Sequence, residues 1–204
     1  MSIHQPSPAN AGHRVVDELL SANKHFAESF GDGEALDARP ARRLAVVTCM
    51  DARILPDALL GLAQGEAHVI RNAGGRVTDD VLRSLIVSTH LLDVRHIAVI
   101  HHTECGMAST DDAAIARQVA ETTGSDPGGL EFATIADPGE ALSGDVTRVR
   151  ACPYLPDGTI VSGHVYDVRD GRLNCRVPPA PIERHDAAAV PSRAMRHVKS
   201  PRRE

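Results

Sequence analysis

The sequence lacks any apolar run long enough to span a bilayer. Its longest apolar stretch covers residues 44 to 50 and is interrupted by Thr48, whereas a transmembrane helix needs about 20 apolar residues. The first twenty residues also lack a basic segment followed by an apolar one, which a secretory signal requires. We therefore expect a cytoplasmic protein without a membrane partner.

Excess positive charge is absent as well. Lysine and arginine total 22 against 27 aspartates and glutamates, which leaves a formal net charge of -5. Nucleic-acid binding requires clustered Lys and Arg, so we expect no nucleic-acid partner and a small substrate. The paired glycines Gly74 and Gly75 do not belong to a G-x-G-x-x-G pattern, which disfavours a dinucleotide site.

Cysteine is sparse, and the positions of the four cysteines therefore matter more than their number. Without an export signal, they are better interpreted as free thiols or metal ligands than as a disulfide framework. We expect Cys152 and Cys175 to be small structural residues.

The length of 204 residues fits one domain with short extensions. Residues 1–11 are rich in Ser, Pro, Asn and Gly and are predicted to be a flexible lead-in, and residues 12–178 are predicted to form the folded domain. Residues 179–204 combine Pro, Ala and a basic excess and are predicted to be a disordered tail.

Apolar periodicity within the domain alternates between helical and strand patterns. The expected helices cover 15–30, 56–62, 79–92, 111–123 and 137–150. The expected strands cover 44–48, 68–70, 97–100, 159–168 and 172–177. This alternation predicts an α/β fold with a central, mostly parallel β-sheet, four parallel strands plus a short edge strand, flanked by helices.

Two clusters of chemically reactive residues follow the expected strands. Cys49 ends the first strand, and His102 and Cys105 lie at the end of the third. Ligands of an open α/β sheet collect beyond the carboxyl ends of its strands, so we predict that two thiols and an imidazole converge on one Zn2+ per chain. Three protein ligands leave the fourth tetrahedral position to water, as in catalytic zinc sites, and zinc lowers the pKa of that water to about 7.

Asp51 and Arg53 lie just beyond the first predicted ligand. An arginine can hold a carboxylate in a fixed orientation through paired hydrogen bonds. We therefore expect Arg53 to orient Asp51, and Asp51 to accept a hydrogen bond from zinc-bound hydroxide. Released from Arg53, the same carboxylate would instead close the fourth metal position.

These motifs resemble those of the β-class carbonic anhydrases, in particular their short prokaryotic branch, over about residues 14–178. The resemblance is carried by Cys49-Met-Asp-Ala-Arg53, by residues 65–75 (GEAHVIRNAGG), by Arg83-Ser84 and by His101-His-Thr-Glu-Cys-Gly-Met107. It implies zinc on the three predicted ligands, a catalytic Asp51 and Arg53 pair, reversible hydration of carbon dioxide to bicarbonate, and a homodimer or larger assembly.

The resemblance leaves the substrate open, because the same scaffold and zinc site serve enzymes that hydrolyse carbonyl sulfide or carbon disulfide. A catalytically weak protein that binds bicarbonate or holds zinc structurally is the third alternative. The small residues after Met107 and an aromatic content of 2% predict an open pocket wall. Four histidines are candidates for proton transfer, because imidazole titrates near neutrality: His68, His90, His96 and His101.

Overall fold

The computed structural model describes residues 8–30 and 36–183. They belong to two compact units, one ending at Ala38 and the other beginning at Arg39. The first unit contains helix α1 (Pro8–Glu28), which begins earlier than the predicted residue 15. Among the described residues, no helix is both long and apolar enough to cross a membrane.

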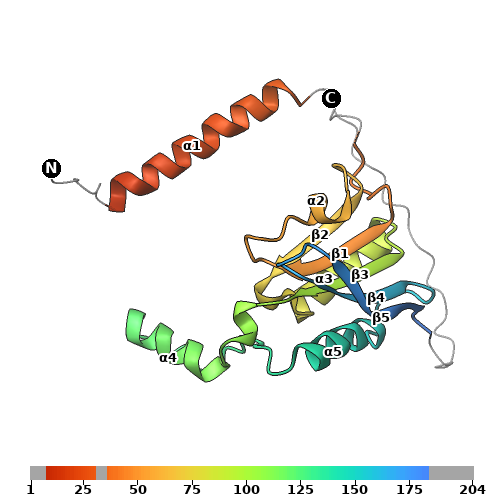
Figure 1. Ribbon diagram of the computed structural model, residues 1–204. Coiled ribbons are helices and arrows are strands. Elements are labelled where there is room, and N and C mark those ends of the chain that lie inside the picture. The colour runs from red at the N-terminus through yellow and green to blue at the C-terminus, as the bar shows by residue number, and fades with distance from the viewer. Residues whose placement is uncertain (1–7, 31–35, 184–204) are drawn as a thin grey trace. The chain divides into compact units, whose positions relative to one another are not determined.

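The second unit is built on a five-stranded sheet with the order β2-β1-β3-β4-β5 (Figure 1). Its strands are β1 (Leu44–Cys49), β2 (Ala67–Asn72), β3 (His96–His102), β4 (Ile160–Tyr166) and β5 (Leu173–Pro181). The first four are parallel, and β5 pairs antiparallel with β4. The predicted fold class is therefore confirmed.

The edge strand β5 is longer than predicted. It continues to Pro181 instead of ending at residue 177, and the next residue, Ile182, is buried in the core. A Pro-rich stretch has the composition of a tail. On an edge strand, however, a proline can direct the position of its missing N–H toward the unpaired side, so no hydrogen bond of the sheet is lost. Residues 184–204 of the predicted tail lie outside the described residues.

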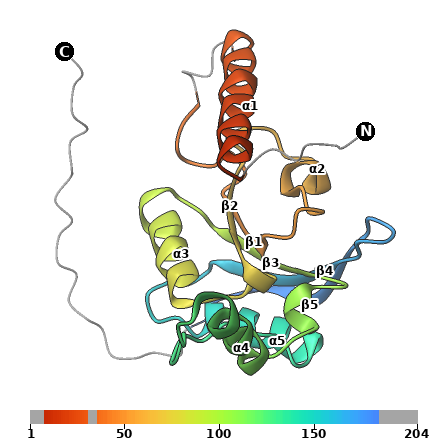
Figure 2. The same cartoon turned by 90° about the vertical axis from the view of Figure 1, so that its left-hand side faces the viewer.

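Four helices accompany the sheet at the predicted places: α2 (Pro56–Leu60), α3 (Asp79–Leu91), α4 (Asp112–Thr123) and α5 (Pro138–Arg150). The three longer ones begin at Thr78, Asp111 and Asp137, whose side chains each accept a hydrogen bond from a backbone N–H in the first turn. Such caps satisfy donors that the helix itself cannot pair. Figure 1 shows α5 along the sheet and α4 beyond its end, and in Figure 2 both helices lie below the sheet, with α4 toward the viewer.

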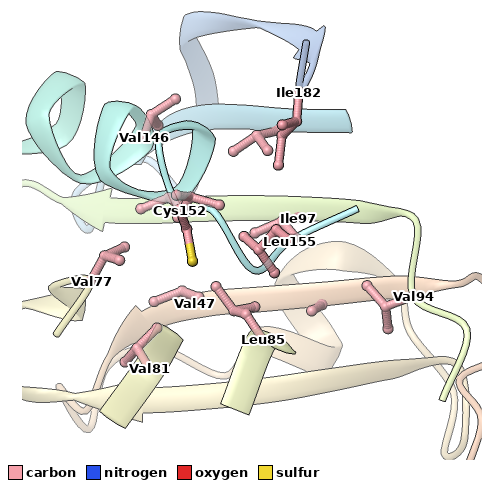
Figure 3. Close-up of a cluster of buried hydrophobic side chains, with 14 of the residues drawn as sticks. Val47, Val77, Val81, Leu85, Val94, Ile97, Val146, Cys152, Leu155 and Ile182 are labelled. Carbon is pink, nitrogen blue, oxygen red and sulfur yellow. The ribbon is translucent and has the colours of Figure 1, made fainter. Parts of the chain in front are cut away.

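The main core lies between the sheet and two of these helices. Helix α3 packs on β1 and β2, and α5 packs on β3 and β4. Val47 of β1 and Ile97 of β3 meet Val81 of α3 and Val146 of α5 in one buried cluster, as Figure 3 shows. The side chains of this cluster are almost fully buried, so their packing fixes the strands whose ends carry the site.

The strand order brings the predicted ligands to one edge. From β1 the chain goes to β2 on one side, and β3 then returns to the other side of β1. Thr48 pairs with Ile100 in this register, so Cys49 and His102 end neighbouring strands. A reversal of this kind opens a crevice beyond the carboxyl ends of the strands.

Candidate metal centre

The three predicted ligands meet at the carboxyl ends of β1 and β3. One ligand atom from each of Cys49, His102 and Cys105 lies within 4.8 Å of the other two. All three residues are buried, with 4 to 5% of their surface exposed. The structure thus brings together the residues that sequence analysis assigned to zinc.

The imidazole of His102 is oriented as a metal ligand. Its Nδ1 lies 2.9 Å from the carbonyl oxygen of Thr103, and because a carbonyl only accepts, Nδ1 carries the proton. The buried Nε2 is left with a lone pair and has no hydrogen-bond partner among the described residues. Burial also lowers the pKa of His102, so the ring is neutral at pH 7. A buried lone pair without a partner is costly unless a metal ion uses it.

The two thiols complete a donor set that suits a transition metal. Burial raises the pKa of the Cys105 thiol, so a bound metal would displace its proton and bind a thiolate. Two sulfurs and one imidazole nitrogen suit zinc, and three protein ligands leave a coordination position open. The residues present therefore fit the predicted metal.

The loop between His102 and Cys105 turns sharply at Glu104. Glu104 has a φ of 56°, the left-handed conformation that residues other than glycine seldom adopt. Its carboxylate accepts a hydrogen bond from Arg169 Nε at 2.7 Å, and its carbonyl oxygen accepts one from Arg53 Nη2 at 3.0 Å. These contacts hold the turn that returns the chain from His102 to Cys105.

Asp51 and Arg53 form the predicted pair. Arg53 Nε lies 3.0 Å from Asp51 Oδ1 and Nη2 lies 2.8 Å from Oδ2, while the Arg53 backbone N–H donates to Oδ1 at 2.9 Å. Hydrogen bonds from the Arg53 side chain, and then from its backbone, hold the pKa of Asp51 well below its usual range. Asp51 Oδ2 is 3.9 Å from His102 Nε2, so an ionised carboxylate faces the ligand atoms.

Arg71 joins the site, although sequence analysis gave it no role. Its Nε donates to the carbonyl oxygen of Cys49 at 3.0 Å, and its Nη2 donates to that of Asp51 at 2.8 Å. Arg71 lies in β2 beside Thr48. A basic residue near the end of the strand next to the ligand strand was the available signal. The arginine fixes the backbone that carries the first ligand and the carboxylate.

Two cavities flank the ligand atoms. The smaller, of about 180 Å³, is lined by Cys49, Asp51 and Cys105 among others. The larger, of about 310 Å³, is lined by His102, Cys105, Ala108 and Ile135 among others. Small residues after Met107 do line the larger cavity, as predicted, but Ile135 supplies an apolar wall that no feature of the sequence indicated.

His101 lies on the opposite side of β3 from His102. Its Nε2 is 3.0 Å from Asp145 Oδ2 on α5, and the same oxygen accepts a hydrogen bond from Arg76 Nε at 2.8 Å. Of the four histidines considered for proton transfer, His101 lines the larger cavity. His96 begins β3 and so lies at the far end of the strand from the ligands.

Comparison with known proteins gives consistent matches. A family described as carbonic anhydrase matches residues 44–126. The β-carbonic anhydrase 1 of Mycobacterium tuberculosis is 39% identical over 160 residues, which cover 78% of this chain and 96% of that protein. The crystal structure of a carbonic anhydrase from Streptococcus mutans superposes with a TM-score of 0.75 at 39% identity, covering 78% of this chain and 96% of that one. A carbon disulfide hydrolase of Acidithiobacillus thiooxidans is 33% identical over 151 residues, covering 65% of this chain and 76% of that protein.

Proposed function

Because this chain belongs to the β-class carbonic anhydrase family, we propose that it catalyses the reversible hydration of carbon dioxide to bicarbonate. The observation that carries the proposal is the open set of three buried ligand atoms beside an ionised carboxylate. This arrangement supplies both halves of a hydration site: a place for a Lewis acid, and an acceptor that orients water.

We propose Zn2+ as the metal, one per chain, held by Cys49, His102 and Cys105. When bound there, zinc lowers the pKa of a coordinated water to about 7. Two thiolates reduce the charge on zinc, so the surrounding residues matter more than they would around three imidazoles. The Thr103 carbonyl fixes the His102 tautomer, and Arg71 fixes the Cys49 carbonyl.

Asp51 and Arg53 are the proposed catalytic residues. Arg53 donates to both carboxylate oxygens of Asp51, which keeps Asp51 ionised and fixes its orientation. The carboxylate oxygens retain lone pairs that face the ligand atoms, so Asp51 accepts a hydrogen bond from the attacking water and directs the lone pair of that water toward the substrate carbon. Positioned acceptors of this kind contribute about 10²–10⁴-fold to a rate.

Replacement of the carboxylate tests this role directly. Asp51→Asn should retain about one zinc per chain and lower kcat/KM for carbon dioxide by at least about 100-fold, measured by stopped-flow hydration and metal analysis. Asp170→Asn is the matched control, because Arg172 donates to Asp170 from its backbone and its guanidinium across the same spacing. It should stay within about twofold of the parent. Equal activity of the Asp51 variant and an active parent would show that Asp51 is not the acceptor that orients the attacking water.

Hydrolysis of carbon disulfide is the second candidate. It is favoured by the relative from Acidithiobacillus thiooxidans, which is named for that activity. Carbon disulfide and carbonyl sulfide are linear and electrophilic at carbon, as carbon dioxide is, so the same acceptor and metal site would serve all three. Parallel assays of the three substrates on the zinc-loaded protein separate the candidates, and binding of bicarbonate without any turnover would indicate a binding protein.

We also propose that the chain forms a homodimer or a larger homo-oligomer. Helix α1 carries exposed apolar residues at helical spacing, including Val15, Val16, Leu19 and Leu20, each with more than half of its surface exposed. A contiguous apolar stripe of this kind marks a packing surface. A second copy of the chain is the partner that the family relationship favours.

A further inference from the structure

Ile135 reaches the metal centre from a segment far from both ligand motifs. It lies between α4 and α5, is 4% exposed, and packs in one buried cluster with Cys49, Ile54 and Cys105. Its backbone N–H donates to the carbonyl oxygen of Met107 at 2.8 Å. One apolar side chain from outside the motifs therefore belongs to the buried cluster that contains both thiol ligands.

The segment that carries Ile135 is held firmly on the side of α4. Asp112 accepts hydrogen bonds from the backbone N–H groups of Phe132 at 2.8 Å and Thr134 at 3.1 Å. The Thr134 hydroxyl also donates to Asp112, at 2.5 Å. These bonds, that of the Thr134 side chain foremost, lower the pKa of Asp112, so the anchor is ionised at neutral pH.

Arg76, which lies in the loop before α3, holds the same segment from a second element. Its Nη1 donates to the carbonyl oxygens of Ala133 and Thr134, at 2.8 and 3.1 Å, and its Nε pairs with buried Asp145. A wall whose preceding residues are anchored by both Asp112 and Arg76 cannot withdraw easily when a larger molecule enters. Ile135 therefore presents a fixed surface to the cavity.

We propose that Ile135 is the residue that determines which linear triatomic substrate reaches the metal centre. This inference rests on the proposed function, because it concerns the substrate of the same site. Ile135 lines the cavity of about 310 Å³ together with His102 and Cys105, and it faces residues as small as Ala108 there. Sulfur is larger than oxygen and forms longer bonds to carbon, so the position of this wall discriminates carbon dioxide from carbon disulfide.

Variants at Ile135 should change substrate preference more than zinc content. One carbon atom more or less in an apolar pocket changes discrimination about 10–200-fold. Ile135→Ala removes three carbons and should raise the ratio of kcat/KM for carbon disulfide to that for carbon dioxide by at least about tenfold. Ala108→Leu narrows the same cavity and should lower the ratio. Ile135→Val, a smaller deletion, provides the test if the alanine variant does not fold.

Leu130→Ala is the matched control. Leu130 lies in the same inter-helix segment but is 62% exposed, so its truncation removes as much apolar volume without enlarging the cavity. Its substrate ratio should stay within about twofold of the parent. A ratio equally unchanged in the Ile135 variants, with zinc retained, would overturn the inference.

A binding measurement makes the inference independent of turnover. Cyanate and thiocyanate are linear triatomic anions that differ by oxygen against sulfur, and their binding to the cobalt-substituted protein is measurable by visible absorption. Ile135→Ala should shift the ratio of their dissociation constants toward thiocyanate by about tenfold or more. If the parent protein turns over none of the three substrates but this shift occurs, the proposed function fails and the role of Ile135 stands. If the parent hydrates carbon dioxide and neither ratio moves, the role of Ile135 fails alone.

Discussion

Gly75 is the position at which one added methyl group should do the most damage to the site. Its φ is +67°, in the region that alanine rarely adopts, and a Cβ built there would lie 2.8 Å from Cys49 N and 2.9 Å from the carbonyl carbon of Thr48. Both are backbone atoms of β1, an interior strand of the sheet that is buried from its second residue to its last. The close approach of the glycine turn to the first ligand therefore requires a residue without a side chain.

The expected cost of Gly75→Ala has two parts. The left-handed conformation costs alanine about 1–2 kcal/mol, and overpacking of a buried site costs typically about 1–3 kcal/mol. Together they predict a loss of about 2–5 kcal/mol in the free energy of unfolding. Relief of the clash would also displace the Cys49 backbone, so zinc affinity should fall with stability.

Gly124→Ala separates the cost of the left-handed conformation from the cost of overpacking. Gly124 ends α4 with a φ of +72°, and a Cβ there would have nothing within 4 Å, so only the conformational cost of about 1–2 kcal/mol applies. Urea denaturation at a fixed zinc concentration measures the loss of stability in both variants, and competition with a chelator measures zinc affinity. Equal losses in the two variants, with equal zinc affinity, would refute the argument from close approach.

Two further predictions concern the buried carboxylate behind the site and the oligomer. Burial raises the pKa of Asp145, but hydrogen bonds from His101 and Arg76 outweigh burial and hold the pKa below its usual value. The ionised carboxylate therefore contributes its full stabilisation above about pH 4, the pKa of an unfolded Asp. This stabilisation is lost as the pH falls through the lower pKa of the folded state. Asp145→Asn should lower the free energy of unfolding by about 3–5 kcal/mol at pH 7 and by less at acid pH, and a loss that does not depend on pH in urea titrations would contradict this. In sedimentation velocity, Leu19→Glu with Leu20→Glu should shift the protein toward monomer, whereas Ser21→Glu on the same helix should not; an unshifted double variant would exclude α1 from the interface.

The fold and the convergence of Cys49, His102 and Cys105 were predictable because their signals are local. Alternating strand and helix patterns specify a parallel sheet, and the carboxyl ends of neighbouring strands must share an edge. Cys49 and His102 were therefore expected to meet before their distances were known. The pair Asp51 and Arg53 was predictable for the same reason, since two residues separated by one position need only a short turn to form paired hydrogen bonds.

What the sequence did not reveal depends on contacts between distant segments. Arg71 acts through two carbonyl oxygens, and backbone acceptors carry no signature of their own in a sequence. Ile135 resembles any apolar residue of a loop, and its position follows only from anchors at Asp112 and Arg76. The end of β5 was missed because its prolines have the composition of a tail, while its pairing with β4 is a tertiary contact.

The same distinction bears on the substrate of this chain, because its relatives carry different names. The family match ends at residue 126, before Ile135, although it includes every predicted ligand and both members of the Asp51 and Arg53 pair. Proteins named as a β-carbonic anhydrase and as a carbon disulfide hydrolase are 39% and 33% identical to this chain. In the function proposed for this chain, residues inside the matched region set the chemistry at the metal, and the Ile135 wall outside it partly sets the size of the molecule admitted. Substrate preference can therefore change through substitutions near residue 135 while the ligands stay the same, and the motifs alone do not identify the substrate.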